Sequence, residues 1–86
     1  MHLALTFTLA AEGEWQHFLD HDRKLAELVD PILNSIESGE LPGQMWNNKK
    51  RFTTLRVPGR DESYLVAWEN LPDERRIVRI GVVHNT

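Results

Sequence analysis

The chain has 86 residues, of which 41% are hydrophobic and 27% charged, and its formal net charge is -3. A chain of this length buries roughly 60–65% of its unfolded surface, which supports one core and excludes a second domain. It has no cysteine, which excludes disulfides, thiolate metal ligands and cysteine nucleophiles. We therefore expect one globular domain over residues 1–86, in a reducing compartment.

The most apolar stretch of the sequence is residues 1–11. It is too short to cross a bilayer, which takes about 20 residues. It also lacks a basic leader, and Glu12 and Glu14 follow directly, which is not the pattern of a signal peptide. We expect this stretch to be a strand of a cytoplasmic protein without membrane contact.

Charge is divided unevenly along the chain. Residues 1–42 carry eight acidic and two basic side chains, a net of -6, whereas residues 43–86 carry eight basic and five acidic ones, a net of +3. This division permits a basic face for phosphate in an otherwise acidic protein. Taken alone, it is more typical of a solvated surface with incidental ion pairs.

The first half of the sequence predicts a strand and two helices. Apolar side chains alternate over His2–Leu9, which indicates a strand. From Ala10 they recur at helical spacing after an acidic first turn, which indicates a helix. The chain breaks at Asp22, which would cap a second helix that ends at Gly39. Because the apolar stripe continues past Pro31, we expect a kink there rather than a stop.

The second half predicts three strands. A loop rich in proline, glycine and asparagine covers Glu40–Asn48. The strands are Arg51–Val57, Tyr64–Glu69 and Arg76–Val83, and their short connections force antiparallel pairing. The sequence therefore predicts an α+β fold: an N-terminal strand, a helical hairpin, then a three-stranded antiparallel meander. The resulting mostly antiparallel sheet would carry the helices on one face.

Strand alternation sorts the basic residues. We assign Val78 and Ile80 to the core face, which leaves Ile77 and Arg79 on the face away from the helices. By the same alternation, Arg56 in the strand Arg51–Val57 lies on that face too. The other cations near it in sequence are Arg60, Lys49, Lys50, Arg51 and His84. Arginines on a sheet face, with aromatic rings beside them, are typical of proteins that bind RNA.

The aromatic and histidine residues leave alternatives open. Trp68 and Tyr64 share one face of the middle strand, where stacking on RNA and packing in the core fit the pattern equally. His17 and His21 have the spacing of metal ligands on a helix, but no third ligand is evident. We interpret them as an exposed polar face and expect no metal site.

Three local patterns and the ending at His84 are distributed over nearly the whole chain. The patterns are Leu5–Glu12, Arg23–Gly39, and Leu55–Val57 followed by a glycine turn and Tyr64–Trp68. These patterns resemble the strand-to-helix entry, the second helix, and the leucine-arginine-valine strand, turn and tyrosine-containing strand of the RelE/ParE superfamily of bacterial toxins. The ending at His84 resembles the YoeB branch of that superfamily.

The resemblance implies a ribosome-dependent endonuclease, the toxin of a type II toxin–antitoxin pair. Such enzymes inhibit translation by cutting mRNA. The 2′-hydroxyl attacks the adjacent phosphate, which needs a base for the hydroxyl, a cation for the phosphate and an acid for the leaving oxygen. Arg56 and Arg60 would stabilise the phosphate, and His84 would transfer protons. The RNA-binding residues would be Lys49, Lys50, Arg51, Arg79 and Trp68. No cofactor is implied. The partners would be a cognate antitoxin, the ribosome and mRNA, in a homodimer or a toxin–antitoxin hetero-oligomer.

Several positions depart from the family's pattern. Tyr64 or Leu65 replaces the arginine that opens the middle strand, and threonines replace the lysines of the strand before it. No acid near Gln44 matches the YoeB glutamate. Two alternatives therefore stay open: a ParE-like toxin that inhibits a protein such as DNA gyrase, and an inactive homologue that only binds an antitoxin or nucleic acid.

Overall fold

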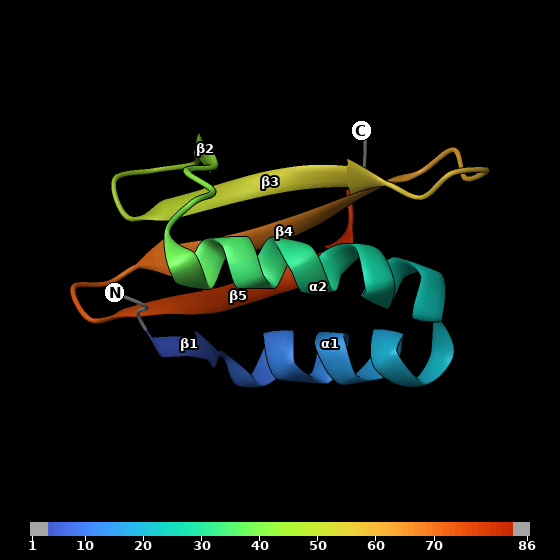
Figure 1. Ribbon diagram of the computed structural model, residues 1–86, viewed down its shortest axis with the longest axis horizontal. Coiled ribbons are helices and arrows are strands. Elements are labelled where there is room, and N and C mark those ends of the chain that lie inside the picture. Colours follow the sequence, from blue (N-terminus) through green and yellow to red (C-terminus); the bar gives the residue numbers. More distant parts are fainter. Residues whose placement is uncertain (1–3, 84–86) are drawn as a thin grey trace.

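A computed structural model describes residues 4–83 (Figure 1). The elements are β1 (Ala4–Phe7), α1 (Leu9–His21), α2 (Arg23–Ser38), β2 (Gln44–Met45), β3 (Lys50–Arg56), β4 (Ser63–Asn70) and β5 (Glu74–Val82). They form one five-stranded sheet in the order β1-β5-β4-β3-β2. All neighbours are antiparallel except β1 and β5, which are parallel. The predicted α+β fold is confirmed.

Polar caps set the boundaries of the helices. The hydroxyl of Thr8 accepts a hydrogen bond from the Ala11 N–H, so α1 begins at Leu9 and the first strand ends at Phe7 rather than at the predicted Leu9. Asp22 caps α2 as predicted, and Gly39 ends that helix with a φ of 80°. α2 continues through Pro31. Within residues 4–83, neither helix is long and apolar enough to span a membrane.

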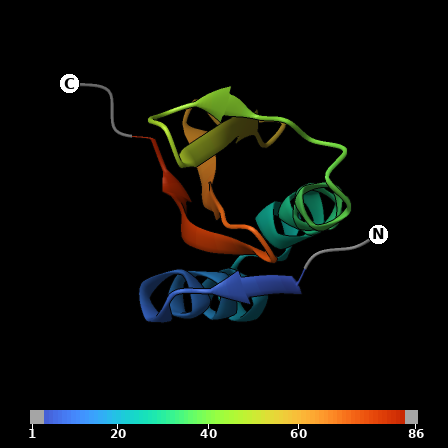
Figure 2. The same cartoon turned by 90° about the vertical axis from the view of Figure 1, so that its left-hand side faces the viewer.

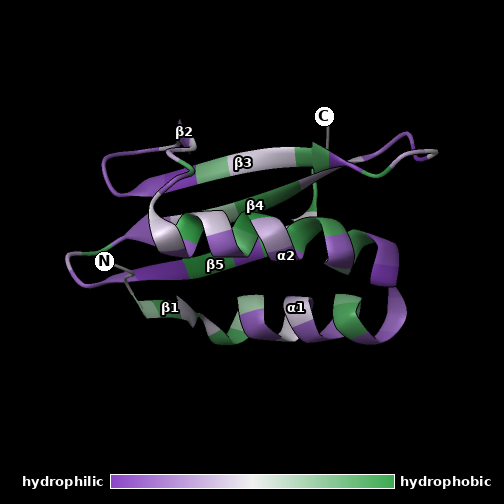
Figure 3. Cartoon of the chain, in the orientation of Figure 1, coloured by the Kyte–Doolittle hydropathy of each residue, from purple (hydrophilic) through white to green (hydrophobic). Residues whose placement is uncertain are grey.

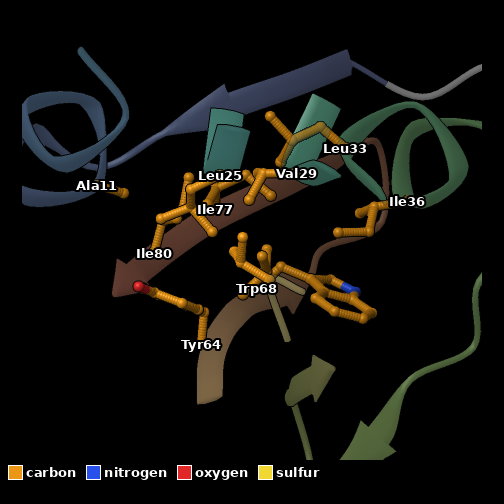
Figure 4. Close-up of a cluster of buried hydrophobic side chains, with 11 residues drawn as sticks. Ala11, Leu25, Val29, Leu33, Ile36, Tyr64, Trp68, Ile77 and Ile80 are labelled. Carbon is orange, nitrogen blue, oxygen red and sulfur yellow. The ribbon is translucent and has the colours of Figure 1, made fainter. Parts of the chain in front are cut away.

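The core lies between α2 and the sheet. Hydrophobic and hydrophilic residues recur in turn along the ribbon of α2 (Figure 3), and its buried apolar side chains lie against β4 and β5 (Figure 4). The buried residues of this cluster are Ala11, Leu25, Val29, Leu33, Ile36, Val57, Tyr64, Val66, Trp68, Ile77 and Ile80. α1 packs beside α2 and β5. Within the described residues, no helix covers the opposite face of β3 and β4 (Figure 2).

A β-bulge in β5 corrects one prediction. Ala67 pairs with Arg79, but the next residue, Trp68, pairs with Ile77, so Val78 is an extra residue. Ile77 and Ile80 are consequently both buried in the core. The prediction that Ile77 lies on the face away from the helices is wrong, because strict alternation fails across a bulge.

The predicted loop at 40–48 contains a short strand. β2 pairs with β3, with Gln44 opposite Phe52 and Met45 opposite Arg51. The side chain of Asn47 accepts hydrogen bonds from the N–H groups of Lys49 and Lys50, at 3.0 and 2.9 Å. The hairpin therefore forms around an asparagine turn.

Candidate nucleic-acid interface

The face of β3, β4 and β5 opposite α2, here called the open face, carries two exposed arginines. Strand pairing sets Arg79 in one row with Ala67 and Phe52. Arg56 lies further along β3, opposite Ser63. The side chains of Arg56 and Arg79 are exposed, as strand alternation predicts.

Arg56 is oriented by the turn that follows β3. Its Nη2 donates to the carbonyl oxygens of Arg60 and Asp61, at 3.3 and 3.1 Å. A guanidinium has five N–H donors, so these two bonds leave donors for a phosphate. The turn thus holds a cation at the end of the open face.

Arg60 is engaged elsewhere. Its two Nη atoms donate to the two carboxylate oxygens of Asp22, each at 2.8 Å, and Nη1 also donates to the hydroxyl of Tyr64 at 2.9 Å. The Asp22 hydrogen bond raises the pKa of Arg60, and the Arg60 hydrogen bond lowers that of Asp22 below its usual 3.8. In this structure Arg60 therefore joins the β3–β4 turn to the junction of the helices, and phosphate would have to displace Asp22 to reach it.

The hydroxyl of Tyr64 lies between two charged groups. It accepts from Arg60 and donates to a carboxylate oxygen of Glu62 at 2.6 Å. Burial of the ring is the main cause that raises the pKa of Tyr64, and the Glu62 contact adds to it. Tyr64 is therefore a neutral link in the cluster rather than a source of negative charge.

Arg79 lies beside a carboxylate that the sequence analysis did not assign to the site. Its Nε is 3.9 Å from Oε2 of Glu14 in α1, and Oε1 of Glu14 accepts a 3.0 Å hydrogen bond from the Ile80 N–H. A cleft of about 690 Å³ opens between α1 and β5 at this point, and His17 also lines it. No sequence signal could have found Glu14, because α1 meets β5 only in the folded chain.

The three basic residues at the start of β3 lie in different surroundings. Lys49 is exposed in the hairpin. The ammonium of Lys50 is 6.0 Å from the centre of the Trp46 ring. Arg51 pairs with the core residue Trp68, which puts it on the helix side of the sheet, half-buried. The structure therefore brings Lys49 and Lys50 together but separates Arg51 from the open face.

Known structures share the fold of this chain, although no protein-family model and no curated protein matches the sequence. The YoeB dimer from Staphylococcus aureus superposes with a TM-score of 0.63 at 14% identity, over 99% of this chain and 100% of that one. The chromosomal ParDE system of P. aeruginosa gives 0.56 at 18% identity, over 96% and 98%. The chain has the fold of the YoeB and ParE toxins. A YoeB/ParE toxin from Agrobacterium tumefaciens also matches, with a TM-score of 0.56 at 11% identity, over 95% and 100%.

In this YoeB/ParE fold Trp68 belongs to the core. Its side chain is 1% exposed, and its Nε1 donates to Oδ1 of Asn70 at 3.1 Å. Of the two alternatives that the sequence left open, the structure has core packing, so Trp68 does not lie on the open face. The residue that the resemblance assigns to proton transfer, His84, lies outside the described residues.

The two histidines of α1 are neighbours on the surface of the YoeB/ParE fold. The ring centroids of His17 and His21 are 4.9 Å apart. Between residues 4 and 83, no group of three or more histidine, aspartate or glutamate side chains is placed to hold a metal ion.

Proposed function

We propose that the chain is the toxin of a type II toxin–antitoxin pair, a RelE-like endonuclease that cuts mRNA on the ribosome and so inhibits translation. The observation that carries the proposal is the pair of exposed arginines, Arg56 and Arg79, on the sheet face opposite α2. The fold shared with the YoeB and ParE toxins supports it.

The proposed chemistry needs positive charge beside a phosphate. The 2′-hydroxyl attacks the adjacent phosphorus, and the bond to the 5′-oxygen breaks, so negative charge builds up on the phosphate oxygens. Arg56 and Arg79 would stabilise that charge, and Lys49 and Lys50 would contact the flanking backbone. His84 would carry a proton, as the resemblance implies.

Arg60 and Trp68 have other roles in this proposal. The guanidinium of Arg60 is paired with Asp22, and the ring of Trp68 is buried. We therefore assign Arg60 to holding the turn that orients Arg56, and Trp68 to the core. Arg79 takes the phosphate-binding place that the sequence analysis gave to Arg60.

The proposed partners follow from the solved relatives. One of them is a heterotetrameric complex of the YoeB toxin with the YefM antitoxin from Staphylococcus aureus, which gives a TM-score of 0.59 at 14% identity over 99% of this chain and 100% of that chain. Another is a YoeB dimer. We propose a cognate antitoxin for this chain, in a hetero-oligomer or beside a homodimer, and the cytoplasm as the place where it meets ribosomes.

Induced expression in a bacterial host, with primer-extension mapping of cellular mRNA, tests the proposal. The wild type should arrest growth and produce mRNA cuts, and Arg56→Ala and Arg79→Ala should reduce both. Arg23→Ala, which removes an exposed arginine from α2, is the matched control and should behave as the wild type. Undiminished cutting by both open-face variants would refute the assignment of these arginines.

A ParE-like toxin that inhibits a protein such as DNA gyrase is the second candidate. The exposed side chain of Thr54 favours it, because RelE toxins carry lysine on this strand and the open face here has fewer cations for RNA. Growth arrest with intact mRNA would support this candidate. Soluble, folded protein that causes no arrest would instead indicate an inactive homologue that only binds its partner.

A further inference from the structure

The open face carries an apolar pocket that is separate from the core. Trp46, Phe52 and Leu65 line a cavity of about 240 Å³. The side chain of Trp46 is 54% exposed, and its ring meets that of Phe52 edge to face with centroids 6.2 Å apart. Neither Phe52 nor Leu65 is among the partly buried residues that pack against the core. We call these three residues the Trp46 platform.

The hairpin of β2 and β3 holds the platform in place. The Trp46 N–H donates to the carbonyl oxygen of Lys50 at 2.9 Å, beside the asparagine turn described above. Gln44, two residues before Trp46, pairs with Phe52 across the hairpin. An exposed aromatic ring on an ordered hairpin loses little conformational entropy when it binds a ligand. The platform therefore combines an exposed aromatic ring with an ordered backbone, which are properties of a binding surface.

The chain segment that carries Trp46 and Phe52 is basic. Residues 41–60 contain five basic and no acidic side chains, a net of +5, while the remaining residues hold five basic and thirteen acidic ones, a net of -8. The Lys50 ammonium lies 6.0 Å from the Trp46 ring, and Arg79 lies in the same row as Phe52. The nearest acid in register, Glu69 opposite Lys50, also faces Arg76 at 3.9 Å. An apolar pocket beside a basic segment fits a ligand that is aromatic and anionic at once.

We propose that the Trp46 platform binds an unpaired base of single-stranded RNA, with Lys50 and Arg79 on the phosphates beside that base. Bases stack on aromatic side chains in a way that tolerates any sequence, and cations beside the ring fix the backbone. An apolar peptide would need the pocket but not the basic segment around it. The inference deepens the proposed function, on which it rests, because it names how the RNA is held.

Binding of a fluorescently labelled single-stranded hexanucleotide to the purified protein tests the platform. The probe is 2′-O-methyl RNA, which has no 2′-hydroxyl to attack the phosphate and so is not cleaved. Trp46→Ala should bind it at least about fivefold more weakly, whereas Trp46→Phe keeps an aromatic ring and should retain most of the affinity. Met45→Ala is the matched control, because Met45 is 63% exposed on the other face of β2 and should not matter.

A second probe with one base removed separates stacking from charge. It should bind the wild type more weakly than the intact probe, while Trp46→Ala should bind both alike. Circular dichroism and thermal unfolding of each variant confirm that it is folded. Equal affinity of the wild type and folded Trp46→Ala for the intact probe would overturn the platform, and so would a wild type that does not bind it.

The outcomes for the platform and for the nuclease are distinguishable. Trp46-dependent binding by a protein that leaves cellular mRNA intact would support the platform and refute the nuclease. Normal mRNA cutting by Trp46→Ala, with unchanged probe affinity, would refute only the platform. A dimer in sedimentation that Trp46→Ala dissociates, with no effect of the variant on RNA affinity, would assign the platform to a contact between copies and overturn the inference.

Discussion

Asp22 influences the candidate site without touching it. Its carboxylate accepts two 2.8 Å hydrogen bonds from Arg60. The carbonyl oxygens of Arg60 and Asp61 in turn accept hydrogen bonds from the guanidinium of Arg56. The same carboxylate caps α2 through the Leu25 N–H. One side chain thus fixes the start of a helix, the position of a turn and the direction of an exposed arginine.

Asp22→Asn should remove a pH-dependent part of the stability. The hydrogen bond from Arg60 is the largest cause that lowers the pKa of Asp22 below 3.8. Because the folded-state pKa lies below the unfolded one, the pair stabilises the protein above pH 3.8 and loses this effect as pH falls through the folded value. Chemical unfolding above and below that pH should show a steeper loss for the wild type than for Asp22→Asn, which still caps α2. If the free energy of unfolding depends on pH equally in both proteins, the Asp22–Arg60 pair does not contribute to stability.

Gly43→Ala should be strongly destabilising. Gly43 has a φ of 69°, and a Cβ there would lie 2.5 Å from the buried ring of Trp68. Strain and overpacking together should cost roughly 2–4 kcal/mol in the free energy of unfolding. Gly39→Ala is the control, because Gly39 has a φ of 80° but nothing within 4 Å, so only the strain of about 1 kcal/mol applies. If urea unfolding shows that Gly43→Ala and Gly39→Ala lower the free energy of unfolding equally, there is no clash with Trp68.

At the scale of elements, α1 continues the contacts that β1 makes along the edge of β5. β1 pairs with β5 only as far as Ile77, and beyond it no strand within residues 4–83 lies beside that edge of β5. There the carboxylate of Glu14 accepts the Ile80 N–H at 3.0 Å. The bulge at Val78 lies at this change of partner and lets both Ile77 and Ile80 enter the core.

Glu14→Ala should expose the edge of β5. The Ile80 amide would lose its acceptor, which should cost about 1–2 kcal/mol and speed its hydrogen exchange. Glu14→Gln keeps an acceptor oxygen and should protect the amide nearly as well. Amide exchange followed by NMR measures both, with the exposed Glu12→Ala as a control on the same helix. If the Ile80 amide exchanges no faster in Glu14→Ala than in the wild type, the hydrogen bond to Glu14 is not what protects it.

What the sequence could predict was local. The caps of α2 and the antiparallel meander follow from Asp22, Gly39 and the shortness of the turns, which are signals within a few residues. The bulge at Val78 has no such signal, since it depends on how β4 and α1 pack against β5. The pair of Asp22 and Arg60 joins residues 38 positions apart. Trp68 was ambiguous because alternation names two faces but not which one is covered.

At the scale of the molecule, acidic and basic side chains are concentrated in different segments of the chain. The helical segment 9–38 holds seven acidic and two basic side chains, a net of -5, whereas residues 41–60, which form β2 and β3, have a net of +5. A separation of this kind turns the basic edge toward an approaching polyanion and the helices away from it. An acidic protein can therefore meet RNA with one edge of its sheet.

RNA binding should depend on salt through the cations that contact phosphate, and Lys49 on the basic edge is one of them. For a single strand, each phosphate contact contributes about 0.7 to the slope of log Kd against log salt. Lys49→Ala should lower the slope by about that amount. Lys24→Ala, on the exposed surface of α2, should leave it unchanged. Equal effects of the two variants would show that binding follows overall charge rather than the basic edge.

The parallel pairing of β1 with β5 determines when the protein can fold during its synthesis. Ala4 pairs with Glu74, seventy residues later, and the apolar side chains of α2 pack on strands that the ribosome makes after the helix. A nascent chain that ends before β5 therefore leaves Leu25 and Val29 uncovered, open to aggregation or to a chaperone. Contacts so distant in sequence form slowly and together. Core and open face should thus appear in a single late step, once residue 82 has left the ribosomal tunnel.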